Sequence, residues 1–138
     1  MVIPITDFNV IFKLAECFNE DISGWNVSHA TRMRKMFKGA RSFNQPIGKW
    51  NVSSITDMTY MFWETYASFY ASFNADLYSW NTSNVITMKG MATTFNQDFS
   101  KWDVSKVVDM SYIFESFLFQ FKFVGLASFE HHRHEIYV

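Results

Sequence analysis

The sequence predicts an α/β solenoid, a right-handed coil with one short parallel strand and one short helix in each repeat of about 25 residues. Three observations support this prediction. Four segments of twenty residues align without a gap, apolar and aromatic residues keep their spacing inside each segment, and the connectors between segments vary in length. Rigid blocks joined by elastic connectors are typical of stacked coils with variable outer loops.

The aligned blocks begin at Phe18, Phe43, Phe73 and Phe95. In every block Trp follows Phe by 7 residues, Met follows Trp by 8, and a further apolar residue follows by 3. The stretch Ile5-Thr6-Asp7-Phe8 matches Ile55-Thr56-Asp57-Met58, so we expect the chain to begin in the middle of a repeat of a longer array. Residues 1–114 are therefore predicted to form about four and a half repeats, and residues 115–138 a divergent Phe-rich tail or cap.

The strand is expected around tryptophan. In Ile22-x-x-Trp25-x-Val27, Trp25 and Val27 would point to the same face of a strand, because side chains two residues apart share a face. The residue between them must then face solvent, which gives one exposed position per repeat: Asn26, Asn51, Asn81 and Asp103. This rhythm resembles the strand segment of leucine-rich repeats, and we expect the four tryptophans to form one column.

The helix is expected after the serine that follows each strand. Ser28 is a good N-cap, and apolar residues follow it at helical spacing (Ala30, Met33, Phe37 and Ala40). Phe-Asn would close each coil with a turn. The Asn, for example Asn19, is expected in a buried ladder that satisfies backbone groups of adjacent coils.

These blocks closely resemble the BspA-like surface-protein repeat, F-N-x-D-[IL]-x-x-W-[ND]-V-S-x-V-x-x-M-x-x-M-F, over about residues 5–114. That family is a mycoplasma-type surface lipoprotein repeat of unknown function, related to leucine-rich repeats. The resemblance implies display at the cell surface or secretion, and a role in adhesion or protein–protein contact. It brings no catalytic residues.

Composition narrows the function classes. A chain of 138 residues that is 49% hydrophobic and 20% aromatic must bury a core. Its net charge of −1 argues against a nucleic-acid partner. No apolar run is long enough to span a membrane, and residues 1–12 do not form a signal peptide. One cysteine excludes an internal disulfide.

Candidate chemical sites have simpler explanations. No phosphate loop, H-E-x-x-H or G-x-S-x-G motif occurs, so no catalytic residue, cofactor or metal is expected. Cys17 and His29 are the only thiol–imidazole pair in the repeats, but Cys17 aligns with Ser42 and reads as a turn residue. A metal at His131, His132 and His134 would lack an acidic shell. Two sets of aspartates recur at fixed repeat positions and could bind calcium, but we interpret them as turn and cap residues: Asp7, Asp57 and Asp109, and Asp21, Asp76 and Asp98.

Two surfaces are candidates for partner contact. The first is the exposed row of Asn26, Asn51, Asn81 and Asp103, whose three asparagines also lie in N-x-[ST] sequons. The second is a basic patch in the first complete repeat: Arg32, Arg34, Lys35, Lys38 and Arg41. This patch is either a solvated outer face or a docking site for an acidic partner or an anionic polymer.

The resulting hypothesis is a non-enzymatic, monomeric module that binds a protein or a glycan. The alternatives are a vestigial fragment of a longer array and a polysaccharide-active enzyme of the β-helix type. The enzyme would need clustered carboxylates, whereas the exposed row offers only Asp103.

Overall fold

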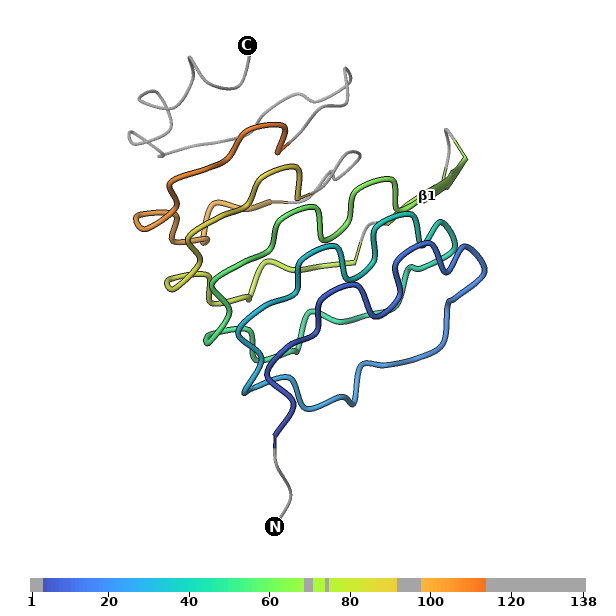
Figure 1. The fold of residues 1–138 in the computed structure, drawn as a ribbon, viewed down its shortest axis with the longest axis horizontal. Helices are drawn as coiled ribbons and strands as arrows, with labels where there is room; N and C mark the ends of the chain where they lie inside the picture. Colours follow the sequence, from blue (N-terminus) through green and yellow to red (C-terminus); the bar gives the residue numbers. More distant parts are fainter. Residues whose placement is uncertain (1–3, 69–70, 74, 92–97, 114–138) are drawn as a thin grey trace.

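The computed structural model describes residues 4–68, 71–73, 75–91 and 98–113. Across these residues the backbone runs in successive windings that lie side by side, in sequence order from blue to orange in Figure 1. The only strands in the described residues are β1 (Tyr66–Ser68) and β2 (Ala71–Ser72), an antiparallel hairpin in the longest connector. The predicted α/β solenoid is wrong, because the described part of the chain contains no helix and has no strand in any of the aligned blocks.

Single-residue parallel bridges mark equivalent positions of the windings. They join, in order, Asp7, Arg32, Asp57, Thr87 and Asp109. Beyond each bridge, the N–H of alternate residues donates to a carbonyl of the next winding. Lys35 donates to Thr59 at 2.9 Å, and Phe37 donates to Met61 at 2.9 Å. The windings are therefore held together by backbone hydrogen bonds.

The remaining backbone forms short turns where a helix was predicted. The N–H of Met36 donates to Met33 at 3.2 Å, that of Lys38 to Lys35 at 3.2 Å, and that of Ala40 to Phe37 at 2.9 Å. Lys35 (φ 56°) and Gly39 (φ 71°) are left-handed, which a right-handed helix does not allow. These turns begin at every second residue and overlap, and the buried side chains Met33, Met36, Phe37 and Ala40 still recur with a helix-like spacing of three to four residues.

The predicted strands are also turns. The N–H of each tryptophan donates to the apolar residue three positions earlier, for example Trp50 to Ile47 at 3.0 Å. A second turn follows directly, in which Ile55 donates to Val52 at 3.0 Å. The apolar-x-x-Trp-x-Val spacing therefore places side chains inward from two linked turns.

Phenylalanines of successive windings stack in the core. The ring centroids of Phe12 and Phe37 are 5.5 Å apart, those of Phe37 and Phe62 are 5.5 Å apart, and the interplanar angles are 10° and 2°. A second row of phenylalanines runs beside the first, with Phe37 and Phe43 only 4.0 Å apart. Because Phe37 is fully buried, removing its ring should be costly.

Tryptophans tie each winding to the previous one. The indole N–H groups of Trp50, Trp80 and Trp102 donate to the carbonyls of Ile22, Ile47 and Leu77 at 3.2, 3.2 and 3.0 Å. The rings of Trp80 and Trp102 are 6.2 Å apart and nearly parallel. The expected stacking of tryptophan rings is therefore seen for Trp80 and Trp102, and Trp50 makes the equivalent hydrogen bond to the previous winding. Trp25, in the first winding, is 40% exposed.

The predicted asparagine ladder is not buried. Asn19 and Asn44 are both exposed. Asn19 nevertheless links two windings, because its Oδ1 accepts the N–H of Asn44 at 2.9 Å. The Phe-rich segment 115–138 lies outside the described residues.

Candidate functional site

The predicted polar row lies on the surface. Asn26, Asn51, Asn81 and Asp103 are all exposed, at equivalent positions of four windings. Each side-chain oxygen accepts the N–H of the serine two residues later. The distances are 3.1, 3.2, 3.1 and 2.9 Å for Ser28, Ser53, Ser83 and Ser105. These serines are therefore turn residues rather than helix caps.

These turns fix the orientation of the amides. In Asn26 and Asn51 the same oxygen also accepts the serine hydroxyl, at 2.7 Å in both cases. Since the oxygen is engaged by the serine, the amide NH₂ group is the part that is available to a partner. At the end of the row, hydrogen bonds from the side chain and backbone of Ser105 lower the pKa of Asp103, so this carboxylate is ionised at neutral pH.

The structure separates the residues of the predicted basic patch into different surroundings. Arg41 is paired with Glu16 at 3.7 Å. Arg32 lies between Asp7 and Asp57 in the series of single-residue parallel bridges, which we call the bridge column. Arg34, Lys35 and Lys38 lie together.

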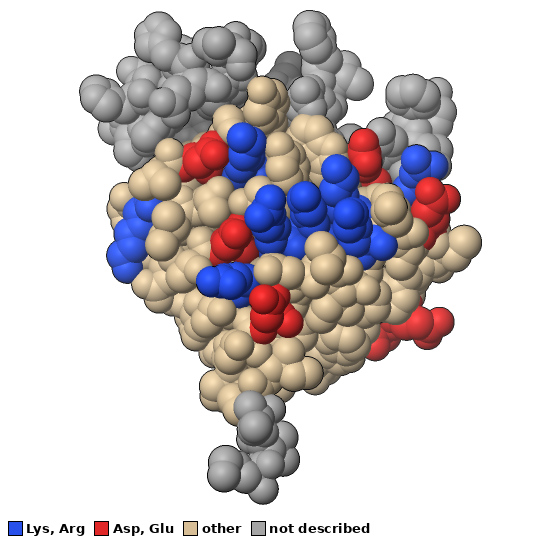
Figure 2. Space-filling model, in the orientation of Figure 1, with Lys and Arg blue, Asp and Glu red and all other residues tan. Residues whose placement is uncertain are grey.

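The sequence-based interpretation missed Lys13, which joins these three residues. The charges of Arg34, Lys13 and Lys38 all act on Lys35. Lys13 precedes Lys38 by 25 residues, the same separation as that from Asp7 to Arg32, so the winding length could have revealed it. We call Lys13, Arg34, Lys35 and Lys38 the cationic cluster. Figure 2 shows Lys and Arg side chains gathered near the centre of the face that it presents.

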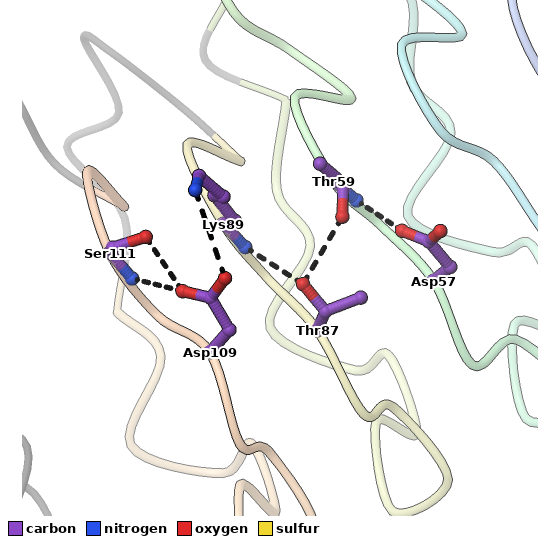
Figure 3. A network of polar contacts seen from close by, with 6 residues as sticks. All are labelled: Asp57, Thr59, Thr87, Lys89, Asp109 and Ser111. Carbon is purple, nitrogen blue, oxygen red and sulfur yellow. Dashed lines mark hydrogen bonds and ion pairs between the residues drawn. The ribbon is translucent and has the colours of Figure 1, made fainter.

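Next to the cluster, a polar network crosses three windings (Figure 3). Its members are Asp57, Thr59, Thr87, Lys89, Asp109 and Ser111. Asp57 accepts the N–H of Thr59 at 2.8 Å, and the Thr59 and Thr87 hydroxyls are 3.1 Å apart. Lys89 pairs with Asp109 at 4.0 Å. Lys89 therefore has a carboxylate within ion-pair distance, unlike the lysines of the cationic cluster.

The recurrent aspartates are turn residues. Asp7, Asp57 and Asp109 accept the N–H of the residue two positions later, and so do Asp21, Asp76 and Asp98. In the bridge column Arg32 separates Asp7 from Asp57, and Thr87 separates Asp57 from Asp109. Among the described residues no three His, Cys, Asp or Glu side chains form a group that could hold a metal ion.

Within the described part of the chain, the remaining candidates are Cys17 and His29. Cys17 is exposed, and His29 lies beside the Ser28 hydroxyl at 3.2 Å. No hydrogen bond joins Cys17 and His29 among the described residues. His131, His132 and His134 lie outside them. Within the same part of the chain, no helix is long and apolar enough to cross a membrane.

Comparison with protein families gives a match over residues 2–71 and 67–123 to the family described as "Mycoplasma protein of unknown function, DUF285". The predicted mycoplasma-type relationship is therefore confirmed at this level, and the match assigns no activity. Searches of curated proteins and of solved structures gave no match. The chain belongs to the DUF285 family of mycoplasma proteins of unknown function.

Proposed function

We propose that this protein is a non-enzymatic interaction module that acts in adhesion, at the cell surface or after secretion, and binds a protein or glycan through the polar row. The observation that carries this proposal is the row itself. It consists of Asn26, Asn51, Asn81 and Asp103 at one position of successive windings, all exposed and all held by a serine. A kinship with BspA-like surface proteins, suggested by the block motif, belongs to the same proposal.

The row suits recognition better than catalysis. Its amides are fixed in direction before a partner arrives, so little side-chain entropy is lost on binding. Amide groups on a rigid surface suit hydrogen bonding to sugar hydroxyls or to a peptide backbone. Hydrolysis of a glycosidic bond normally needs two carboxyl groups within about 10 Å, and Asp103 is the only carboxylate of the row.

The test is an exchange of amide for carboxylate. Asn51→Asp keeps an oxygen that accepts the Ser53 N–H but removes the outward NH₂ donor. Asn19→Asp is the matched control, since it makes the same change at another exposed position and keeps the acceptor for the Asn44 N–H. Thermal unfolding of both variants verifies that they remain folded.

Binding of the labelled protein to an oligosaccharide array and to intact cultured epithelial cells is the readout. We expect Asn51→Asp to weaken binding about tenfold, which corresponds to the loss of one good hydrogen bond to a partner, and Asn19→Asp to leave it unchanged. Equal binding by the two variants, absence of binding by the parent protein, or release of shortened oligosaccharides from the array would contradict the proposal.

A further inference from the structure

The cationic cluster is an unneutralised charge concentration built from two adjacent windings. Lys13 lies on one winding, and Arg34, Lys35 and Lys38 lie on the next. The N–H of Leu14 donates to the carbonyl of Lys38 at 2.7 Å, and that of Val10 donates to Arg34 at 3.0 Å. Chains paired in this way run about 4.8 Å apart. Among the described residues, none of the four cations has a carboxylate within ion-pair distance.

The neighbouring positive charges act on Lys35. The nearby charge of Arg34 lowers the pKa of Lys35, with further contributions from desolvation and from the charges of Lys13 and Lys38. The chain as a whole carries a net charge of −1, so the cluster is a local excess of positive charge on a nearly neutral chain. A bound anion would relieve the repulsion, and this relief favours binding.

An aromatic support holds two of the lysines. The ammonium groups of Lys35 and Lys38 lie over the Tyr60 ring, 6.0 and 5.6 Å from its centroid. Trp63 meets the same ring edge-on at 5.2 Å. A Cβ atom at Gly90 would overlap with both rings, so the Tyr60 and Trp63 rings pack directly against this glycine. The ring therefore orients cations instead of offering an open face for stacking.

We propose that the cationic cluster binds a sulfated polysaccharide. Sulfate groups along a linear sugar chain remain ionised at all pH values of interest and recur at short intervals, which suits four cations on adjacent windings. Single-stranded nucleic acid normally relies on stacking of bases on aromatic rings, and Tyr60 already has lysines over its ring. This inference concerns a different surface from the polar row and stands independently of the proposed function.

Heparin is the probe, and binding is measured by titration calorimetry at several salt concentrations. The test variant is Lys35→Gln/Lys38→Gln, which removes the two cations held by Tyr60. The matched control is Arg41→Gln/Lys106→Gln. It removes the same charge from residues that are already engaged, since Arg41 pairs with Glu16 and Lys106 donates to Asn84. Far-UV circular dichroism and the melting temperature establish that both variants keep the parent fold.

We expect the parent protein to bind heparin with an affinity that falls steeply with salt. The test variant should lose about tenfold or more at 0.15 M salt, and its log–log salt slope should be smaller by roughly one for each cation removed. The control should bind as the parent does.

Three competing probes decide the class of ligand. Desulfated heparin, a single-stranded oligothymidylate and polyglutamate should all bind more weakly than heparin. Tighter binding of any of them, binding that does not respond to salt, equal losses in the two variants, or no binding of heparin by the parent would overturn the proposal.

Discussion

The stacked phenylalanines give the sharpest test of the core. Phe37 is fully buried and lies 5.5 Å from both Phe12 and Phe62 and 4.0 Å from Phe43. An aromatic side chain buries about 150–250 Å², which at about 25 cal/mol per Å² corresponds to roughly 4–6 kcal/mol. This is an upper bound, because the unfolded chain already hides part of that area. We expect Phe37→Ala to lower the free energy of unfolding by about 4 kcal/mol, within the usual range for such a substitution.

The control for this prediction is Phe12→Ala. Phe12 belongs to the first winding, is half-buried, and stacks on only one neighbouring winding through Phe37. It should cost about half as much, roughly 2 kcal/mol. Urea denaturation measures the free energy of unfolding of both variants, and the m-value should be unchanged. A cost below about 1.5 kcal/mol for Phe37→Ala, or a larger cost for Phe12→Ala, would refute the stacked core.

Two further predictions concern the backbone and the turns. Gly48→Ala should destabilise the folded protein by several kcal/mol, since the new Cβ would run into the carbonyl of Asp76. Gly24→Ala should be nearly neutral, because nothing lies within 4 Å of its Cβ position. Thermal melts of the two variants test this difference. Burial pushes the pKa of Asp109 upward, but hydrogen bonds from Ser111 and the charge of Lys89 outweigh it, so the pKa lies below its ordinary value of 3.8. Stability from this carboxylate is therefore present above that value and lost as the pH falls below it. Asp109→Asn should make the melting temperature less dependent on pH between about 2 and 5, and an unaltered dependence would contradict the assignment.

The sequence predicted which side chains are buried better than it predicted the backbone. Met33, Met36 and Phe37 are buried as expected, and Asn26 and Asn51 are exposed as expected. Both results follow from spacing alone, because the hydrophobic residues must face one interior whatever the local conformation is.

Spacing could not distinguish a helix from a series of turns. The two conformations bury residues at nearly the same interval, and they differ in where the N–H groups donate. The N–H of Phe37 would bond four residues back in a helix, yet it donates to Met61 of the next winding. The left-handed conformation of Lys35 gives no signal in the sequence, since it is not a glycine.

Part of the candidate site was also beyond the local pattern. Five basic residues within ten positions marked the patch, but sequence proximity included Arg41, which pairs with Glu16, and omitted Lys13. The composition of the cationic cluster depends on which residues lie opposite one another in adjacent windings. That register is fixed by the bridge from Asp7 to Arg32, not by the distance between charges along the chain.

The most direct test of the account is the detection of individual hydrogen bonds by through-bond NMR couplings between amide nitrogens and carbonyl carbons. The nitrogens of Met33, Lys35 and Phe37 should couple to the carbonyls of Asp57, Thr59 and Met61. Couplings from Phe37 to Met33 and from Lys38 to Arg34, the pattern of an α-helix, would contradict the stacked windings and the register that assembles the cationic cluster.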